Sequence, residues 1–78
     1  MAGVVKSVAI QPRDGIQVLT CTLEDETGGI SLVFSRGRVD GVEPSARLVA
    51  EGMVGEYDGS LAIRNPTFEL LATATEPD

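Results

Sequence analysis

The residues of this sequence with the most evident chemistry are its arginines and its single tyrosine. The candidate binding residues are Lys6, Arg13, Arg36, Arg38, Tyr57 and Arg64. Guanidinium and ammonium groups bind phosphate oxygens, and an aromatic ring offers a face on which a nucleobase can stack. These residue types therefore make nucleic acid the first candidate ligand.

The net charge of the chain argues in the other direction. Twelve acidic residues oppose six basic ones, which gives a formal charge of −6, whereas proteins that neutralise phosphates usually carry surplus Lys and Arg. A local positive groove then requires the acids to gather at the other end of the molecule. Such a groove could survive the net negative charge if the acids gather there around Glu43, Glu51, Glu56, Asp58 and Glu76.

Several kinds of chemistry are excluded by residue type. The chain has no histidine and one cysteine, Cys21, so it lacks a histidine base, an internal disulfide and a cysteine metal cluster. In the run Glu24-Asp25-Glu26, adjacent strand residues face opposite sides, so we expect Asp25 to cap a turn rather than the three to bind a metal. We expect no enzyme activity, no cofactor and no metal.

Alternation of apolar and polar residues predicts β-strands throughout the chain. The strands are expected at 3–11, 16–25, 30–36, 46–57 and 60–64. Asp14-Gly15 and Asp58-Gly59 predict tight hairpin turns, because both residue types tolerate a positive φ. Gly52 and Gly55 predict a bulge or bend within the long fourth strand.

The core and the long connection can also be anticipated. Cys21 alternates with Leu19 and Leu23, which indicates a small buried residue, and Phe34 and Phe68 are expected in the core, whereas Tyr57 adjoins a turn. Glycine and proline leave no room for a helix in the segment 37–45. We expect this segment to be irregular, with Val39 and Val42 plugging one end of a barrel.

These elements predict one domain at 3–71 and a polar tail at 72–78. Three strands joined by hairpins, a longer crossing and a closing hairpin are typical of an all-β, five-stranded Greek-key OB-fold barrel with little or no helix. An SH3-like barrel is the nearest alternative, but it lacks the long third-to-fourth connection. The absence of a signal-like or membrane-length apolar run favours a cytoplasmic location without membrane contact.

Several segments of the chain, between Gly3 and Leu71, match a known pattern. The matching segments are LEDETGGISLVF at 23–34, Gly41-Val42-Glu43-Pro44, Gly52-Met53-Val54 and LAIRNPTFEL at 61–70. The sequence resembles OB-fold nucleic-acid-binding domains of the RecG-wedge and tRNA-anticodon-like type, and most of all small stand-alone actinobacterial OB-fold proteins. The resemblance implies a barrel that binds nucleic acid on the outer face of its second and third strands.

Two functions from different classes remain open. One is a module that binds single-stranded or junction DNA with low sequence specificity, through arginines more than through stacking. The other is a protein-interaction or self-associating module that docks a partner or a second copy and binds no nucleic acid. The acidic charge and the scarcity of aromatic residues favour the second, and the resemblance favours the first.

Overall fold

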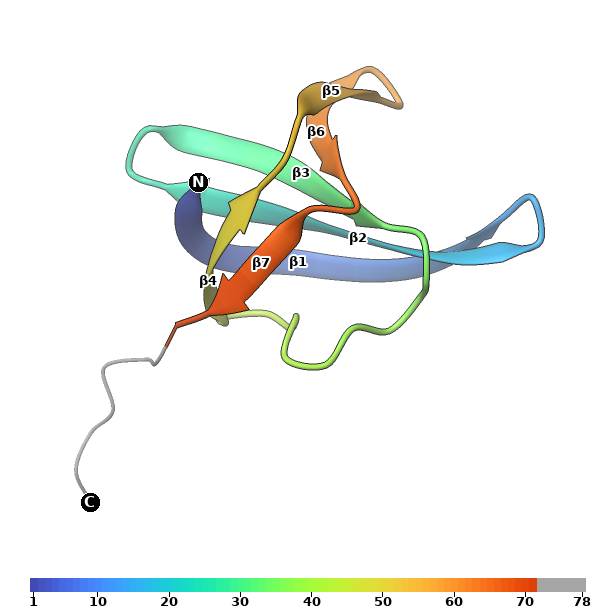
Figure 1. Ribbon diagram of the computed structural model, residues 1–78, viewed down its shortest axis with the longest axis horizontal. Coiled ribbons are helices and arrows are strands. Elements are labelled where there is room, and N and C mark those ends of the chain that lie inside the picture. Colours follow the sequence, from blue (N-terminus) through green and yellow to red (C-terminus); the bar gives the residue numbers. More distant parts are fainter. Residues whose placement is uncertain (72–78) are drawn as a thin grey trace.

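Seven β-strands make up the part of the chain that the computed structural model describes, residues 1–71, and no helix occurs in it (Figure 1). The strands are β1 (Ala2–Arg13), β2 (Ile16–Asp25), β3 (Gly28–Phe34), β4 (Arg47–Glu51), β5 (Val54–Tyr57), β6 (Ser60–Arg64) and β7 (Thr67–Leu70). The expected all-β class without helix is therefore confirmed. The expected tail at 72–78 lies outside the described residues.

The strands form one sheet in the order β5-β6-β3-β2-β1-β4-β7. β1, β2 and β3 are an antiparallel meander, β6 runs parallel to β3, and β4 is antiparallel to β1. The sheet curls into a half-barrel (Figure 1). β4 and β5 follow one another in the sequence but lie in opposite halves of the sheet, so the chain between them spans the open side.

The expected number of strands was wrong, and two local features explain the difference. The single strand predicted at 46–57 is interrupted at Gly52 and Met53, between β4 and β5. A Cβ added at Gly52 would lie 2.6 Å from Cγ2 of Ile63, so glycine permits the close passage there. Downstream of Pro66, Thr67–Leu70 forms the further strand β7, which pairs with β4.

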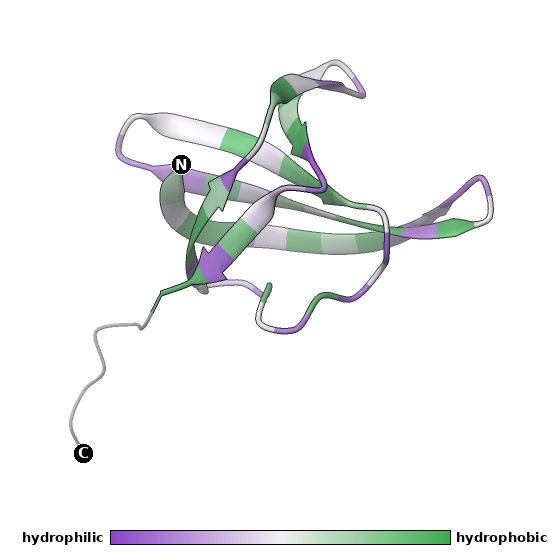
Figure 2. Ribbon diagram, in the orientation of Figure 1, coloured by the Kyte–Doolittle hydropathy of each residue, from purple (hydrophilic) through white to green (hydrophobic). Residues whose placement is uncertain are grey.

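The main core lies on the concave side of the curled sheet. Its buried members are Val5, Leu19, Cys21, Leu23, Leu32, Phe34, Val42, Leu48, Ala50 and Ile63. The Phe34 and Phe68 rings meet edge to face, with centroids 5.6 Å apart. The green, apolar segments in Figure 2 recur on all the central strands. The core positions expected for Cys21, Phe34 and Phe68 are confirmed.

The turns have the backbone conformations that their residues predict. Asp14 and Gly15 have φ values of 52° and 80°, and Asp58 and Gly59 have 53° and 83°. Two successive positive φ values match the twist of a two-residue hairpin. The 37–45 connection is irregular, as expected, and it places Val42 in the core with Val39 packed against it.

Asp25 caps the β2–β3 turn, as its sequence position suggests. Its Oδ1 accepts hydrogen bonds from the hydroxyl and the backbone N–H of Thr27, both at 2.7 Å, and from the N–H of Gly28 at 3.2 Å. These donors, the Thr27 hydroxyl first, lower the pKa of the Asp25 carboxyl. The carboxylate is therefore a structural acceptor that fixes the turn.

Candidate nucleic-acid interface

A second, smaller apolar cluster lies on the convex face of the sheet. Val18 of β2, Val33 of β3 and Ala62 of β6 are buried there, and Tyr57 packs against them. In strands, alternate residues point to opposite faces, so Val18 and Val33 face away from Leu19 and Phe34 of the main core. The β5–β6 hairpin thus holds the tyrosine ring over β2 and β3.

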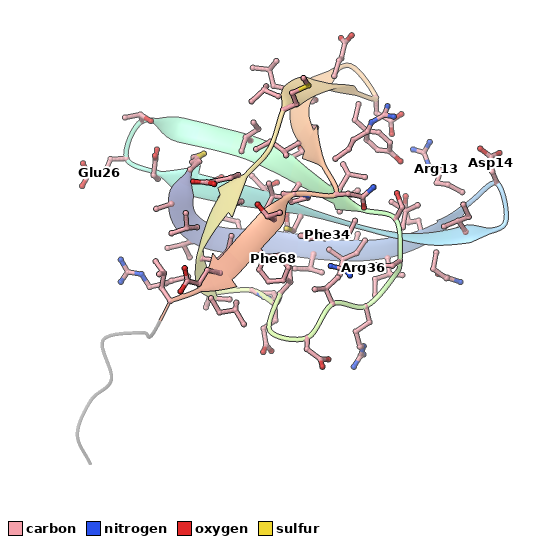
Figure 3. All side chains as sticks on the ribbon, in the orientation of Figure 1. Arg13, Asp14, Glu26, Phe34, Arg36 and Phe68 are labelled. Atoms are coloured by element: carbon pink, nitrogen blue, oxygen red, sulfur yellow. The ribbon has the colours of Figure 1, made fainter. Side chains whose placement is uncertain are left out.

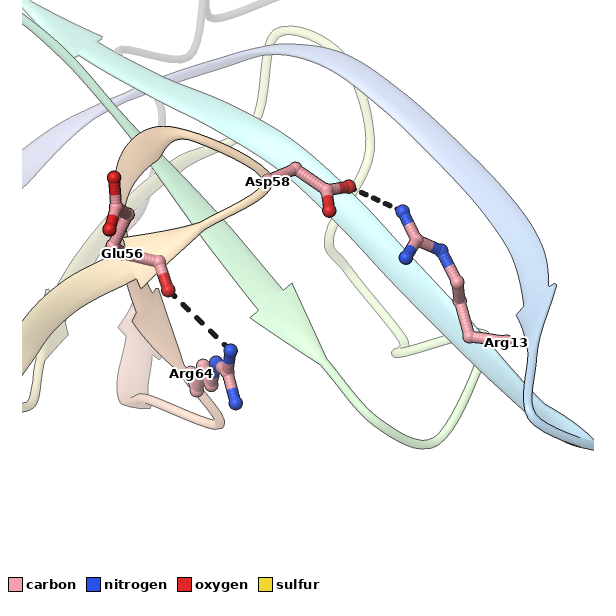
Figure 4. A network of polar contacts seen from close by, with 4 residues as sticks. All are labelled: Arg13, Glu56, Asp58 and Arg64. Carbon is pink, nitrogen blue, oxygen red and sulfur yellow. Dashed lines mark hydrogen bonds and ion pairs between the residues drawn. The ribbon is translucent and has the colours of Figure 1, made fainter.

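Two guanidinium groups flank the Tyr57 ring. The Cζ of Arg13 lies 5.3 Å from the ring centroid and that of Arg64 lies 5.2 Å from it. Both distances are within the range of a cation–π interaction, about 6 Å. The Arg64 guanidinium also donates to the backbone carbonyl of Glu56, at 3.5 Å (Figure 4). We refer to Arg13, Tyr57 and Arg64 as the tyrosine cluster.

An ion pair joins the two hairpins at this cluster. Arg13, at the end of β1, donates to the carboxylate of Asp58, in the β5–β6 turn (Figure 4). The hydrogen bond and the negative charge of Asp58 raise the pKa of Arg13. Both side chains are about half exposed, at 46% and 56%, and such exposed pairs contribute little to stability. The Arg13 guanidinium can therefore exchange Asp58 for another anion at small cost.

Two shallow depressions extend from the cluster across the convex face. A depression of about 60 Å³ is lined by Gln11, Arg13, Val18, Thr20, Tyr57 and Asp58. Thr20 also lines a second one, of about 150 Å³, with Thr22 and Ser31 among its walls. Hydroxyl groups from β2 and β3 thus continue the polar surface away from the tyrosine ring.

The other predicted cations lie elsewhere. Lys6 lines an open depression of about 600 Å³ beside Glu24, Asp25 and Glu26. Glu26 lies at the end of the molecule opposite Arg13 (Figure 3). Arg38 lines a groove between β1 and the 37–45 connection, with the core-side residue Val8. Arg36 is exposed and forms no ion pair or ring contact with residues 1–71.

The acids are not all separated from the candidate arginines, so the condition for a strongly positive groove is not met at the tyrosine cluster. Asp58, one of those acids, pairs with Arg13 there. Glu56 contributes only its backbone carbonyl, which accepts from Arg64, because its side chain lies on the face of β5 opposite Tyr57. Glu76 lies outside the described residues. The cluster therefore combines two arginines with one carboxylate.

Sequence reasoning missed the partner of Arg13. Asp58 was interpreted as a turn residue and as one of the acids that could gather at the opposite end, although it lies 45 positions from Arg13 in the sequence and its carboxylate accepts a hydrogen bond from Arg13. Arg47, which lines the Lys6 depression, was also missed. The only signal for the Arg13–Asp58 pair was that both residues adjoin Asp-Gly turns, which are the loops that flank the binding face of an OB-fold.

Metal and thiol chemistry find no support in the described part of the chain. No group of three or more His, Cys, Asp or Glu residues there could hold a metal ion. Burial raises the pKa of the Cys21 thiol to about 11, which keeps it protonated and unreactive at neutral pH. Among residues 1–71 there is also no helix of the length and apolarity needed to cross a membrane.

Comparison with known proteins gave no relative from which a function could be transferred. No protein-family model matches the sequence, and neither a curated protein nor a solved structure matches it.

Proposed function

We propose that this half-barrel is an OB-fold whose fourth strand is divided into β4 and β5. The pairing pattern supports this: an antiparallel β1-β2-β3 meander, a parallel β3–β6 pair, and contacts of β4 with β1 and of β5 with β6. If β4 and β5 are counted as one strand and β7 is set aside, five elements remain, and they would follow one another around a closed cylinder. β7 is then an addition that extends β4.

We further propose that the protein binds single-stranded or junction DNA, with low sequence specificity, at the tyrosine cluster. The main observation in support is that the Cζ atoms of Arg13 and Arg64, which belong to different hairpins, both lie within 5.3 Å of the Tyr57 ring centroid. This cluster lies on the convex face of β2 and β3, between the β1–β2 and β5–β6 turns, where OB-folds bind oligonucleotides.

The contacts at the cluster suggest how a nucleic acid would be held. A backbone phosphate replaces Asp58 as the acceptor for Arg13, and a second phosphate binds Arg64. Tyr57 is partly buried and its ring is flanked by guanidinium groups, so a base reaches the ring only where an arginine moves toward phosphate. Binding therefore depends more on charge than on stacking, which gives low sequence preference and strong salt dependence.

The test is a fluorescence anisotropy titration of a labelled oligothymidine at several salt concentrations. Replacing both Arg13 and Arg64 with alanine removes two phosphate contacts, which should reduce the slope of log K against log salt by about 1.4, at about 0.7 per contact for single strands. The affinity should fall by about tenfold or more at low salt.

The matched control replaces Arg36 and Arg38 with alanine. It removes the same charge outside the tyrosine cluster, and it should lower the affinity much less than the Arg13 and Arg64 change. Equal losses in both double variants would mean that binding follows overall charge rather than this site. Absence of binding by the unmodified protein at low salt would reject nucleic acid as the ligand.

A further inference from the structure

The β5–β6 hairpin carries a second, apolar surface on the face opposite Tyr57. Val54 of β5 is 57% exposed and Leu61 of β6 is 66% exposed. Val54 lies opposite Ile63, which is a core residue, and Leu61 lies opposite Glu56. Val54 and Leu61 are therefore on the same face of the hairpin as Ile63, but they lie outside the core and are exposed to solvent. Met53, just before β5, is 87% exposed. We call Met53, Val54 and Leu61 the hairpin patch.

Within the described residues 1–71, the patch adjoins an edge of the sheet that has no partner strand. β5 pairs with β6 on one side and ends the strand order on the other. Natural proteins commonly protect such edges with lysine or proline, and the β5 sequence VGEY contains neither. The opposite edge strand, β7, follows Pro66 directly. The β5 edge is thus the less protected one, and it is bordered by apolar side chains.

The charge around the patch indicates the kind of partner. Between Leu48 and Ile63 the chain has three acids, Glu51, Glu56 and Asp58, and no Lys or Arg. Glu56 shares the face of Val54 and Leu61, while Asp58 is paired with Arg13. A second copy paired edge to edge would bring a second acidic hairpin against Glu56, which is unfavourable. A basic partner would be attracted instead.

We propose that the β5 edge and the hairpin patch bind an extended segment of another protein by strand addition. The segment presents apolar side chains to Met53 and Val54 and a Lys or Arg to Glu56, while its backbone pairs with β5 and Leu61 of β6 extends the apolar surface behind Glu56. This surface is separate from the tyrosine cluster, because alternate strand residues face opposite sides. It provides a protein-binding function beyond the proposed binding of nucleic acid.

The test is a titration of the ¹⁵N-labelled full chain with the synthetic peptide Ile-Thr-Lys-Thr-Ile. Binding is measured from the changes in the amide chemical shifts of the protein. The expected result is a saturable shift of the β5 amides, with slower hydrogen exchange at Val54 and Glu56. The same peptide with glutamate in place of lysine should bind about tenfold more weakly, because Glu56 then repels it.

Two variants separate this surface from a general apolar attraction. Val54→Lys together with Leu61→Lys should abolish the shifts, whereas Ile10→Lys, at an apolar position on β1 that is 44% exposed, should leave them unchanged. A dispersed amide spectrum of each variant shows that it is folded. Shifts confined to other strands, equal binding of both peptides, or dimerisation of the unliganded chain through β5 would each overturn the proposal.

Discussion

Tyr57 packs on the convex face and lies at the centre of the proposed binding site. Its ring covers Val18, Val33 and Ala62, and Arg13 and Arg64 each lie close to the ring. Cation–π contacts at exposed sites are weak. The contacts therefore orient the two guanidinium groups without fixing them, so both could turn toward phosphates in the proposed complex.

At the same scale, the buried thiol of Cys21 should make the protein less stable as the pH becomes alkaline. Its folded-state pKa is raised to about 11, and an unfolded thiol ionises near pH 8.5, roughly. The unfolded chain therefore loses this proton first, so the contribution is complete below about pH 8.5 and is lost as the pH rises through the folded-state pKa. Denaturant unfolding should show a falling free energy of unfolding over this range.

Cys21→Ala is the control for that pH dependence. The variant keeps every other titratable group, so it measures the pH dependence that does not come from the thiol. The unmodified protein should have the larger free energy of unfolding at neutral pH, and the difference in this free energy from Cys21→Ala should decrease as the pH rises. The reason is that only the unmodified chain has the thiol. A constant difference from neutral pH to pH 11 would contradict the burial effect.

Residue roles could be predicted from the sequence where they depend on near neighbours. The capping by Asp25 involves Thr27 and Gly28, and the burial of Cys21 follows from strand alternation. The Arg13–Asp58 pair could not be predicted in the same way. The pair depends on the angle between two twisted hairpins, and this angle cannot be predicted from a local sequence pattern.

At the scale of elements, close packing between β1 and β2 depends on Gly3. A Cβ added there would lie 2.5 Å from the backbone oxygen of Glu24, and a backbone carbonyl in a sheet cannot move aside easily. Gly3→Ala should therefore destabilise the protein by about 1–3 kcal/mol, as overpacking does. Thermal unfolding followed by circular dichroism measures the effect.

Gly55 of β5 is the matched control for Gly3. Nothing lies within 4 Å of a Cβ added at Gly55, and its φ is not positive. Gly55→Ala should leave stability unchanged or raise it slightly, because alanine reduces the entropy of the unfolded chain. Equal destabilisation by the two changes would contradict the close β1–β2 approach.

The elements themselves were largely predictable, but the division of the fourth strand was not. The predicted 16–25 and 60–64 strands coincide with β2 and β6, because hairpin turns bound these strands. The predicted 46–57 strand is divided, because Gly52 must pass close to Ile63 of a neighbouring strand. Such long-range proximity cannot be recognised from the alternation of one segment.

For the whole molecule, the net charge of −6 sets the conditions under which a nucleic acid could bind. The six basic residues do not form one groove: Arg13 and Arg64 flank Tyr57, while Lys6 lies beside the acidic β2–β3 turn and Arg38 beside the 37–45 connection. Binding at the tyrosine cluster should therefore be weak at physiological salt and strengthen markedly at low salt.

The β5–β6 hairpin connects the two proposed surfaces of the molecule. One face carries Tyr57 and Arg64, and the other carries Val54 and Leu61. A partner strand added to β5 would leave the ring face open, so protein and nucleic acid could bind together.

The most direct test of the central claim is to locate the nucleic acid on the unmodified protein. A ¹⁵N-labelled sample titrated with oligothymidine at low salt should show saturable amide shifts at Arg13, Tyr57 and Arg64 and along the convex face of β2 and β3. The shifts should reverse when salt is added. No shifts at low salt, or shifts confined to the Lys6 depression and the 37–45 connection, would contradict the claim.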